Sequence, residues 1–177
     1  MRERSLRVRS QLVEEIYNQT EITNKQDNVE APSFSMRARN LVSNSINSDF
    51  SYRPDYEWEG GFVLEVGRTE DFSRLSVPTA NVNSQTFRLT YSIPLYGQFR
   101  AQVSREEVRV VNATIDPLKP FVYEFTAGKT VGKSFLWQIN LDYRIGQNVQ
   151  LSLYYNGRTE GGREPIHLAR MEARAFF

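Results

Sequence analysis

Apolar and polar residues alternate one by one along most of this 177-residue chain. Such a period of two fits a β-strand, because successive strand side chains point to opposite faces. From Tyr56 to Val66, aromatic and aliphatic residues occupy most even positions. The pattern recurs in seven further segments, about 5–17, 34–52, 87–93, 98–104, 135–144, 149–156 and 165–177. The sequence therefore predicts an all-β fold of about eight strands in one domain, residues 1–177.

The connections between these segments alternate between short and long. Tight turns rich in Pro, Gly, Asp and Asn are predicted at 53–55, 94–97 and 145–148. Longer polar stretches fall at about 22–32, 68–83, 111–133 and 158–164. In an antiparallel up-and-down sheet, this order places every tight turn at one end and every long connection at the other. Residues 121–127 also alternate, and we assign them to the third long connection because the parity then holds.

Composition excludes several classes of protein. The 22 basic and 21 acidic residues leave a net charge of +1, so no nucleic-acid partner is indicated. The chain has no cysteine, which excludes disulfides and Cys-ligated zinc. No run approaches the ~20 apolar residues of a transmembrane helix. The N-terminus lacks the apolar region of a signal peptide, so we expect the natural product to be longer, with possible upstream domains.

The last strand ends in Phe177, with apolar residues at every second position before it: Met171, Ala173 and Ala175. This arrangement resembles the C-terminal assembly signal of bacterial outer-membrane β-barrel proteins. More loosely, the stretch from about residue 52 to the end is similar to the closing barrel region of large uncharacterised Gram-negative outer-membrane proteins. The resemblance implies a location in the bacterial outer membrane. It also implies outer-membrane lipid and the barrel assembly machinery as partners.

The interpretation that follows is a transmembrane up-and-down β-barrel, closed by itself or forming the C-terminal part of a larger one. A sheet in lipid must close on itself, because lipid offers no hydrogen bonds to the backbone. Outward positions are then apolar, and inward positions can be charged. The alternative is a soluble lipocalin-like β-barrel or β-sandwich that binds an apolar or carbohydrate ligand and turns its apolar face inward.

Charged residues on the polar face are candidates for lining the lumen. They are Arg37, Arg39, Glu57, Glu59, Glu65, Arg88, Arg100, Asp142, Arg144, Arg170, Glu172 and Arg174. In a narrow barrel these side chains would interlock as ion pairs, whereas in a wider barrel they would line a pore.

Aromatic residues near the tight turns and the chain end are candidates for a girdle at one membrane interface. They are Tyr52, Tyr56, Trp58, Tyr91, Tyr96, Tyr143 and Phe177, with Phe135 and Trp137 expected at the opposite interface.

Catalytic and cofactor-binding motifs are not recognisable. His167 is the only histidine and has no Asp or Ser partner at a catalytic spacing. The run 128–134 ends in Gly-Lys-Ser, but Ala127 occupies the place where a phosphate loop needs glycine, and a predicted strand follows. We therefore expect a non-enzymatic barrel without cofactor or metal, serving as a membrane anchor or as part of a transport pore. An outer-membrane enzyme is the weakest hypothesis.

Overall fold

The described residues form nine antiparallel strands in a single sheet. The computed structural model describes residues 2–13, 16–29, 39–72, 77–112, 126 and 128–176, with side chains described from 18 to 26 and from 40 onwards within those ranges. The strands are β1 Arg2–Val13, β2 Ile16–Val29, β3 Arg39–Tyr52, β4 Trp58–Asp71, β5 Thr79–Ile93, β6 Gly97–Val111, β7 Gly132–Ile145, β8 Val149–Glu160 and β9 Ile166–Ala175. The described residues contain no helix.

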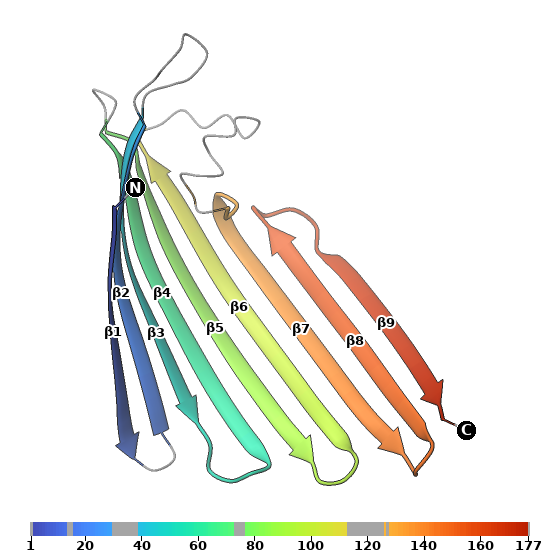
Figure 1. The fold of residues 1–177 in the computed structure, drawn as a ribbon. Coiled ribbons are helices and arrows are strands. Elements are labelled where there is room, and N and C mark those ends of the chain that lie inside the picture. Colours follow the sequence, from blue (N-terminus) through green and yellow to red (C-terminus); the bar gives the residue numbers. More distant parts are fainter. Residues whose placement is uncertain are drawn as a thin grey trace.

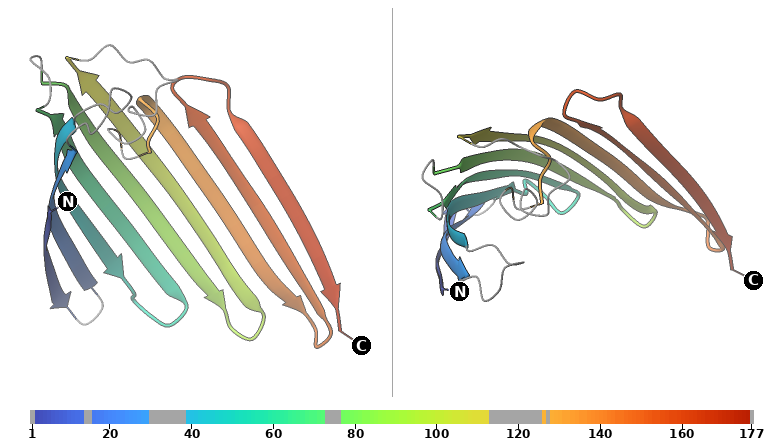
Figure 2. Two further views of the ribbon diagram at one scale, coloured as in Figure 1. Left: turned by 45° about the horizontal axis from the view of Figure 1, so that its top comes forward. Right: turned by 90° about the horizontal axis from the view of Figure 1, so that it is seen from above.

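Each strand pairs with its neighbours in the chain, so the sheet is an up-and-down meander from β1 to β9 (Figure 1). Seen from above, the sheet is curved, with β1 and β9 at the two ends of the arc (Figure 2). The all-β, antiparallel, up-and-down prediction is confirmed.

The N-terminal part differs from the prediction. A single strand at 5–17 and a long connection at 22–32 are both wrong, because β1 ends at Val13 and β2 runs from Ile16 to Val29. The β2 sequence is rich in Asn, Gln and Thr, and its composition alone is typical of a loop. Pairing with β1 and β3 along nearly its whole length holds it in the sheet. The sheet therefore has nine strands where the sequence predicted about eight.

The tight turns lie where the sequence predicts them, and all join strands at the same end of the sheet (Figure 1). In the first, Asp55 Oδ1 accepts hydrogen bonds from the backbone N–H groups of Glu57 and Trp58, each at 2.8 Å. Glu57 therefore lies in the turn and not in a strand, so the strand register assigns it to neither face of the sheet. At the opposite end the strands are longer than predicted, since β4 reaches Asp71 and β5 begins at Thr79.

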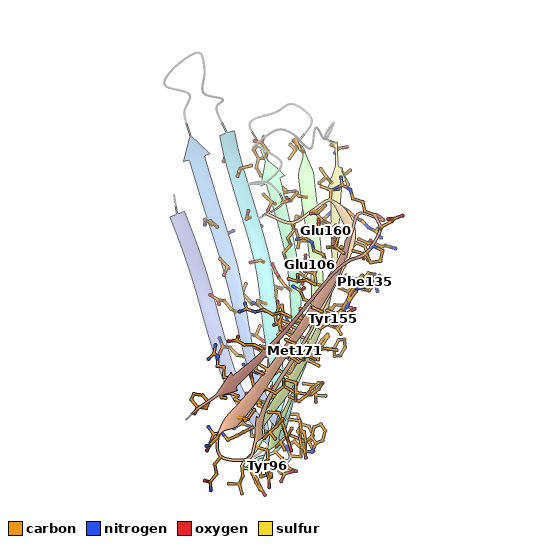
Figure 3. The ribbon with its side chains drawn as sticks, turned by 90° about the vertical axis from the view of Figure 1, so that its right-hand side faces the viewer. Tyr96, Glu106, Phe135, Tyr155, Glu160 and Met171 are labelled. Carbon is orange, nitrogen blue, oxygen red and sulfur yellow. The ribbon has the colours of Figure 1, made fainter. Side chains whose placement is uncertain are left out.

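Strand register gives the two faces of the sheet different chemistry. Phe62 pairs with Phe87 and Phe87 with Val103, so apolar residues form continuous rows across the sheet. On the other face, Glu65 pairs with Ser84 and Ser84 with Glu106. Figure 3 shows Phe135 and Tyr155 on one side of the sheet and Glu106 on the other.

The turn at 94–96 gives a direct test of this fold. Gly97 has φ +157°, and a Cβ there would lie 1.9 Å from the Asp142 carbonyl oxygen of β7. We expect Gly97→Ala to lower the free energy of unfolding by at least about 2 kcal/mol, because the clash is with backbone. Urea unfolding would measure this. Gly60→Ala is the control, since the nearest atom to its Cβ is 4.0 Å away, and an equal loss in both variants would contradict the register.

Candidate functional site

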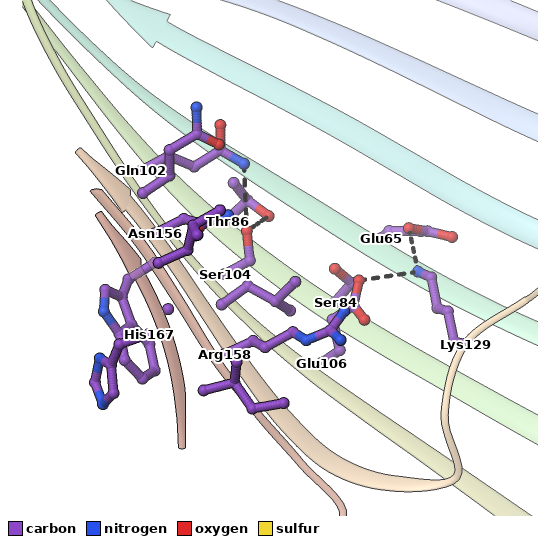
Figure 4. A pocket seen from close by; sticks show the side chains of 16 residues that line it. Glu65, Ser84, Thr86, Gln102, Ser104, Glu106, Lys129, Asn156, Arg158 and His167 are labelled. Atoms are coloured by element: carbon purple, nitrogen blue, oxygen red, sulfur yellow. Dashed lines mark hydrogen bonds and ion pairs between the residues drawn. The ribbon is translucent and has the colours of Figure 1, made fainter. Parts of the chain in front are cut away.

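The last residues of the connection between β6 and β7, 128–131, lie on the concave side of the sheet (Figure 2). Among them, Lys129 places its Nζ 2.7 Å from Glu65 Oε2 on β4 and 3.9 Å from Glu106 Oε1 on β6 (Figure 4). Only 17% of the Lys129 side chain is exposed. Because Lys129 lies on the concave side, the face that carries Glu65 and Glu106 is the concave one. The apolar face is therefore the convex one.

The small residue between the two carboxylates makes room for the ammonium group. Register aligns Glu65, Ser84 and Glu106 in one row across β4, β5 and β6. The row continues through Ser134 to Glu160, whose carboxylate lies 3.5 Å from Arg158. Carboxylates thus alternate with serines across five strands, and Lys129 occupies one of the gaps.

A buried apolar patch lies on the same face. Its members are Leu41, Ala80, Val82 and Val108, all buried. They lie toward the end of the sheet at which the β6–β7 connection begins. Thr126, from that connection, is only 1% exposed.

Beside Lys129 is an open hollow of about 780 Å³. Its lining combines apolar side chains, such as Leu136 and Leu168, and charged ones with six hydroxyl and amide side chains: Ser84, Thr86, Gln102, Ser104, Gln138 and Asn156. The Thr86 and Ser104 hydroxyl oxygens are 2.9 Å apart and share a hydrogen bond. Such a surface offers many donors and acceptors to water or a hydrophilic solute. Within the described chain, no group of three metal-ligating side chains is present.

Most of the predicted charged residues share this concave face. By register they are Glu59, Glu65, Arg88, Arg100, Asp142, Arg144, Arg170, Glu172 and Arg174. Arg37 and the side chain of Arg39 lie outside the described residues, as does Phe177.

Several of these residues form ion pairs with residues of other strands. Arg88 on β5 lies 2.5 Å from Asp49 on β3. Arg100 lies 3.2 Å from Asp142, whose other oxygen accepts a hydrogen bond from Ser152 at 2.7 Å. The concave face is therefore linked by charged and hydroxyl groups across strands.

Sequence reasoning missed the Lys129 ion pairs. Glu106 continues the alternation of its strand, and extending that strand beyond residue 104 would have placed it on the polar face. No comparable sequence pattern predicts the position of Lys129, because residue periodicity does not indicate the path of a connection between strands.

The convex face carries an apolar belt toward the tight-turn end. Its residues include Ile22, Ile46, Phe50, Tyr52, Trp58, Phe62, Leu64, Val66, Phe87, Leu89, Tyr91, Phe99, Ala101, Val103, Phe135, Trp137, Ile139, Leu141, Tyr143, Leu151, Leu153, Tyr155, Ala169, Met171 and Ala173. The belt thins at β2 and β3, where polar pairs such as Thr20 with Ser48 hydrogen-bond to each other at 3.0 Å.

Charged residues of the convex face lie beyond the belt, toward the long connections. In the described side chains they are Arg68, Glu70, Arg105, Glu107, Arg109 and Lys133. The hydrogen bond from Arg109 lowers the pKa of the Glu107 carboxyl. The convex face is thus divided along the strands into an apolar zone and a charged zone.

His167 lies at the border of these zones and not in a catalytic arrangement. Its Nδ1 is 2.9 Å from the Tyr155 hydroxyl, and its ring centroid is 5.6 Å from that of Trp137. Gly157 pairs with both Trp137 and His167, and a Cβ at Gly157 would lie 2.3 Å from the Trp137 ring. The glycine lets the indole lie across β8.

Comparison with protein families, curated protein sequences and solved structures finds no match to this chain. Among the described residues there is also no helix of the length and apolar character needed to cross a membrane.

The Lys129 ion pair can be tested by limited proteolysis. We expect Glu65→Gln to speed trypsin cleavage after Lys129 about fivefold, because losing a half-buried ion pair costs about 1 kcal/mol of local stability. Glu59→Gln, on the same face near the tight turns, is the matched control. Equal cleavage rates in the two variants would show that the pair does not hold the connection.

Proposed function

We propose that this chain forms part of the wall of an outer-membrane β-barrel, with its apolar belt facing lipid and its polar concave face lining a water-filled lumen. The observation that supports this most directly is the exposure of large apolar side chains on the convex face. Phe87 is 60% exposed and Val103 50% exposed, with the concave side polar. An apolar outside and a polar inside are typical of transmembrane barrels.

The belt also has a suitable height. On β4 it spans the nine residues Trp58–Val66, which at ~3.3 Å per residue measure roughly 30 Å along the strand. A strand tilt of about 40° reduces this to about 23 Å across the bilayer, close to the ~25 Å apolar band of such barrels. The charged zone beyond the belt would then lie outside the hydrocarbon, where strands often continue.

Aromatic residues lie near both borders of the belt. Toward the tight turns, Trp58 stacks on Tyr91 with ring centroids 4.2 Å apart, and Tyr96 lies 5.9 Å from Tyr143. Near the opposite border of the C-terminal strands are Phe135 and Trp137, with Tyr155 beside them. Aromatic side chains with polar tips are favoured at membrane interfaces, so these residues would form two girdles.

The barrel would serve as a membrane anchor or as part of a transport pore. Residues 128–131, held by the Lys129 ion pairs on the concave face, would narrow the lumen in either role. Passage would then favour small hydrophilic solutes, because the surrounding side chains are hydroxyls, amides and charges. Met171, Ala173 and Ala175 of β9, together with Phe177 at the chain end, would serve as the assembly signal read by the barrel assembly machinery.

A soluble lipocalin-like barrel or sandwich is the second candidate. It would require the convex apolar belt to be covered by further protein, since exposed apolar patches of this extent are rare on soluble monomers. The two candidates predict different losses of stability when a charged residue is introduced into the belt, depending on whether lipid or protein covers it.

Two substitutions on one face of β5 separate the candidates. Phe87 lies within the belt, and Thr79, eight residues away on the same strand, pairs with Glu70 in the charged zone beyond it. We expect Phe87→Arg to lower the stability of the lipid-embedded protein by about 2–4 kcal/mol, because the guanidinium enters hydrocarbon. Thr79→Arg should change it by less than about 1 kcal/mol, because its guanidinium would lie beside Glu70 outside the hydrocarbon. Urea unfolding in lipid vesicles would measure both.

The membrane proposal would be contradicted by a protein that is monodisperse and folded in buffer without lipid or detergent. Loss of stability in Phe87→Arg that is the same in buffer and in vesicles would indicate a face covered by protein. That outcome would favour the soluble candidate.

A further inference from the structure

The two edges of the sheet carry backbone groups without strand partners. In the described residues β1 pairs only with β2 and β9 only with β8. The two edge strands lie at opposite ends of the arc (Figure 2). On the proposed function, on which this inference rests, both edges lie at membrane depth, where unpaired backbone groups are not tolerated. Each edge therefore needs a strand partner.

Because the number of strands is odd, the two edge strands cannot form antiparallel hydrogen bonds with each other. In an up-and-down meander of nine strands, β1 and β9 run in the same direction, from the long-connection end to the tight-turn end (Figure 1). Pairing them would be parallel. Bacterial single-chain barrels have an even number of antiparallel strands, so an antiparallel closure of this sheet requires an odd number of additional strands.

The concave face gives a second, independent reason for additional strands. The interior of an eight-stranded barrel is just wide enough for its own side chains, and one further strand adds little. Here that face also carries chain from the β6–β7 connection, since Lys129 lies over it with its ammonium group 2.7 Å from Glu65. It must accommodate inward Arg88 and Arg100 as well. A wider barrel provides the space.

A second copy of this sheet does not fit the edges. Joining β9 of one copy to β1 of another in the same orientation is again parallel. Joining β9 to β9 is antiparallel, but it inverts one copy. The apolar belt lies toward the tight turns, and the charged zone toward the long connections. An inverted copy would therefore place its own charges, such as Arg68 and Glu107, at the membrane depth of its partner's belt.

We propose that residues 1–177 are one segment of a wider barrel, completed by an odd number of further antiparallel strands from the same polypeptide. The strand beside β9 must be antiparallel to it, with apolar residues directed outward beside Ala169, Met171 and Ala173. Its inward residues lie beside Arg170 and Glu172, whose side chains already pair at 3.5 Å.

Cross-linking of the complete protein, as cells produce it, tests this inference. A photoreactive benzoylphenylalanine at position 171 probes the free edge of β9. Cysteine pairs combining position 6, 8 or 10 with 169, 171 or 173 probe closure of β1 on β9, and residues 1–177 contain no cysteine that could interfere. Leu153→Cys with Met171→Cys, direct partners across β8 and β9, is the positive control. Only carbonate-washed outer membranes are analysed.

The expected result is a control disulfide, no disulfide for any β1–β9 pair, and a photoproduct joining position 171 to a peptide outside residues 1–177. A β1–β9 disulfide, a photoproduct with a second copy of residues 1–177, or no photoproduct at all would overturn the inference. Release of the protein by the carbonate wash would instead overturn the proposed membrane location. The two failures are therefore distinguishable.

Discussion

Backbone hydrogen bonding between neighbouring strands is the interaction on which this structure depends. The described chain has one layer, and it buries only a small patch of apolar side chains, around Leu41 and Val108. No second sheet or helix in the described residues packs on the apolar belt. The sheet is therefore held together mainly by its strand pairing, and its two faces are free to carry different chemistry. The proposed bilayer would supply the apolar contact that a soluble fold obtains from a second layer.

The chemistry of the two faces follows from a period of two combined with a fixed register. A shift of one residue between strands would move an entire apolar row to the other face. Here Phe50, Phe62 and Phe87 lie in one row across β3, β4 and β5. Arg88 meets Asp49 on the opposite face. Turns with special backbone conformations, such as the one that ends at Gly97, help to fix this register.

Much of this architecture could be predicted from the sequence, because strands with one apolar face leave a direct trace in the residue order. The tight turns, the antiparallel order and the face of residues such as Arg100 and Asp142 all follow from alternation and turn chemistry. Strand β2 was missed because its pairing partners, and not its own apolar residues, hold it in the sheet. Lys129 was missed because its place depends on a long-range contact with Glu65.

The orientation of the apolar belt toward lipid is the central claim, and the two native tryptophans can test it directly. Trp58 and Trp137 both belong to the belt, near its opposite borders. In single-tryptophan variants, made with Trp58→Phe or Trp137→Phe and reconstituted in vesicles, lipids brominated on their acyl chains quench an indole that touches them. We expect strong quenching of both tryptophans by brominated lipid and weak quenching by aqueous iodide. Quenching by iodide but not by brominated lipid would contradict the account.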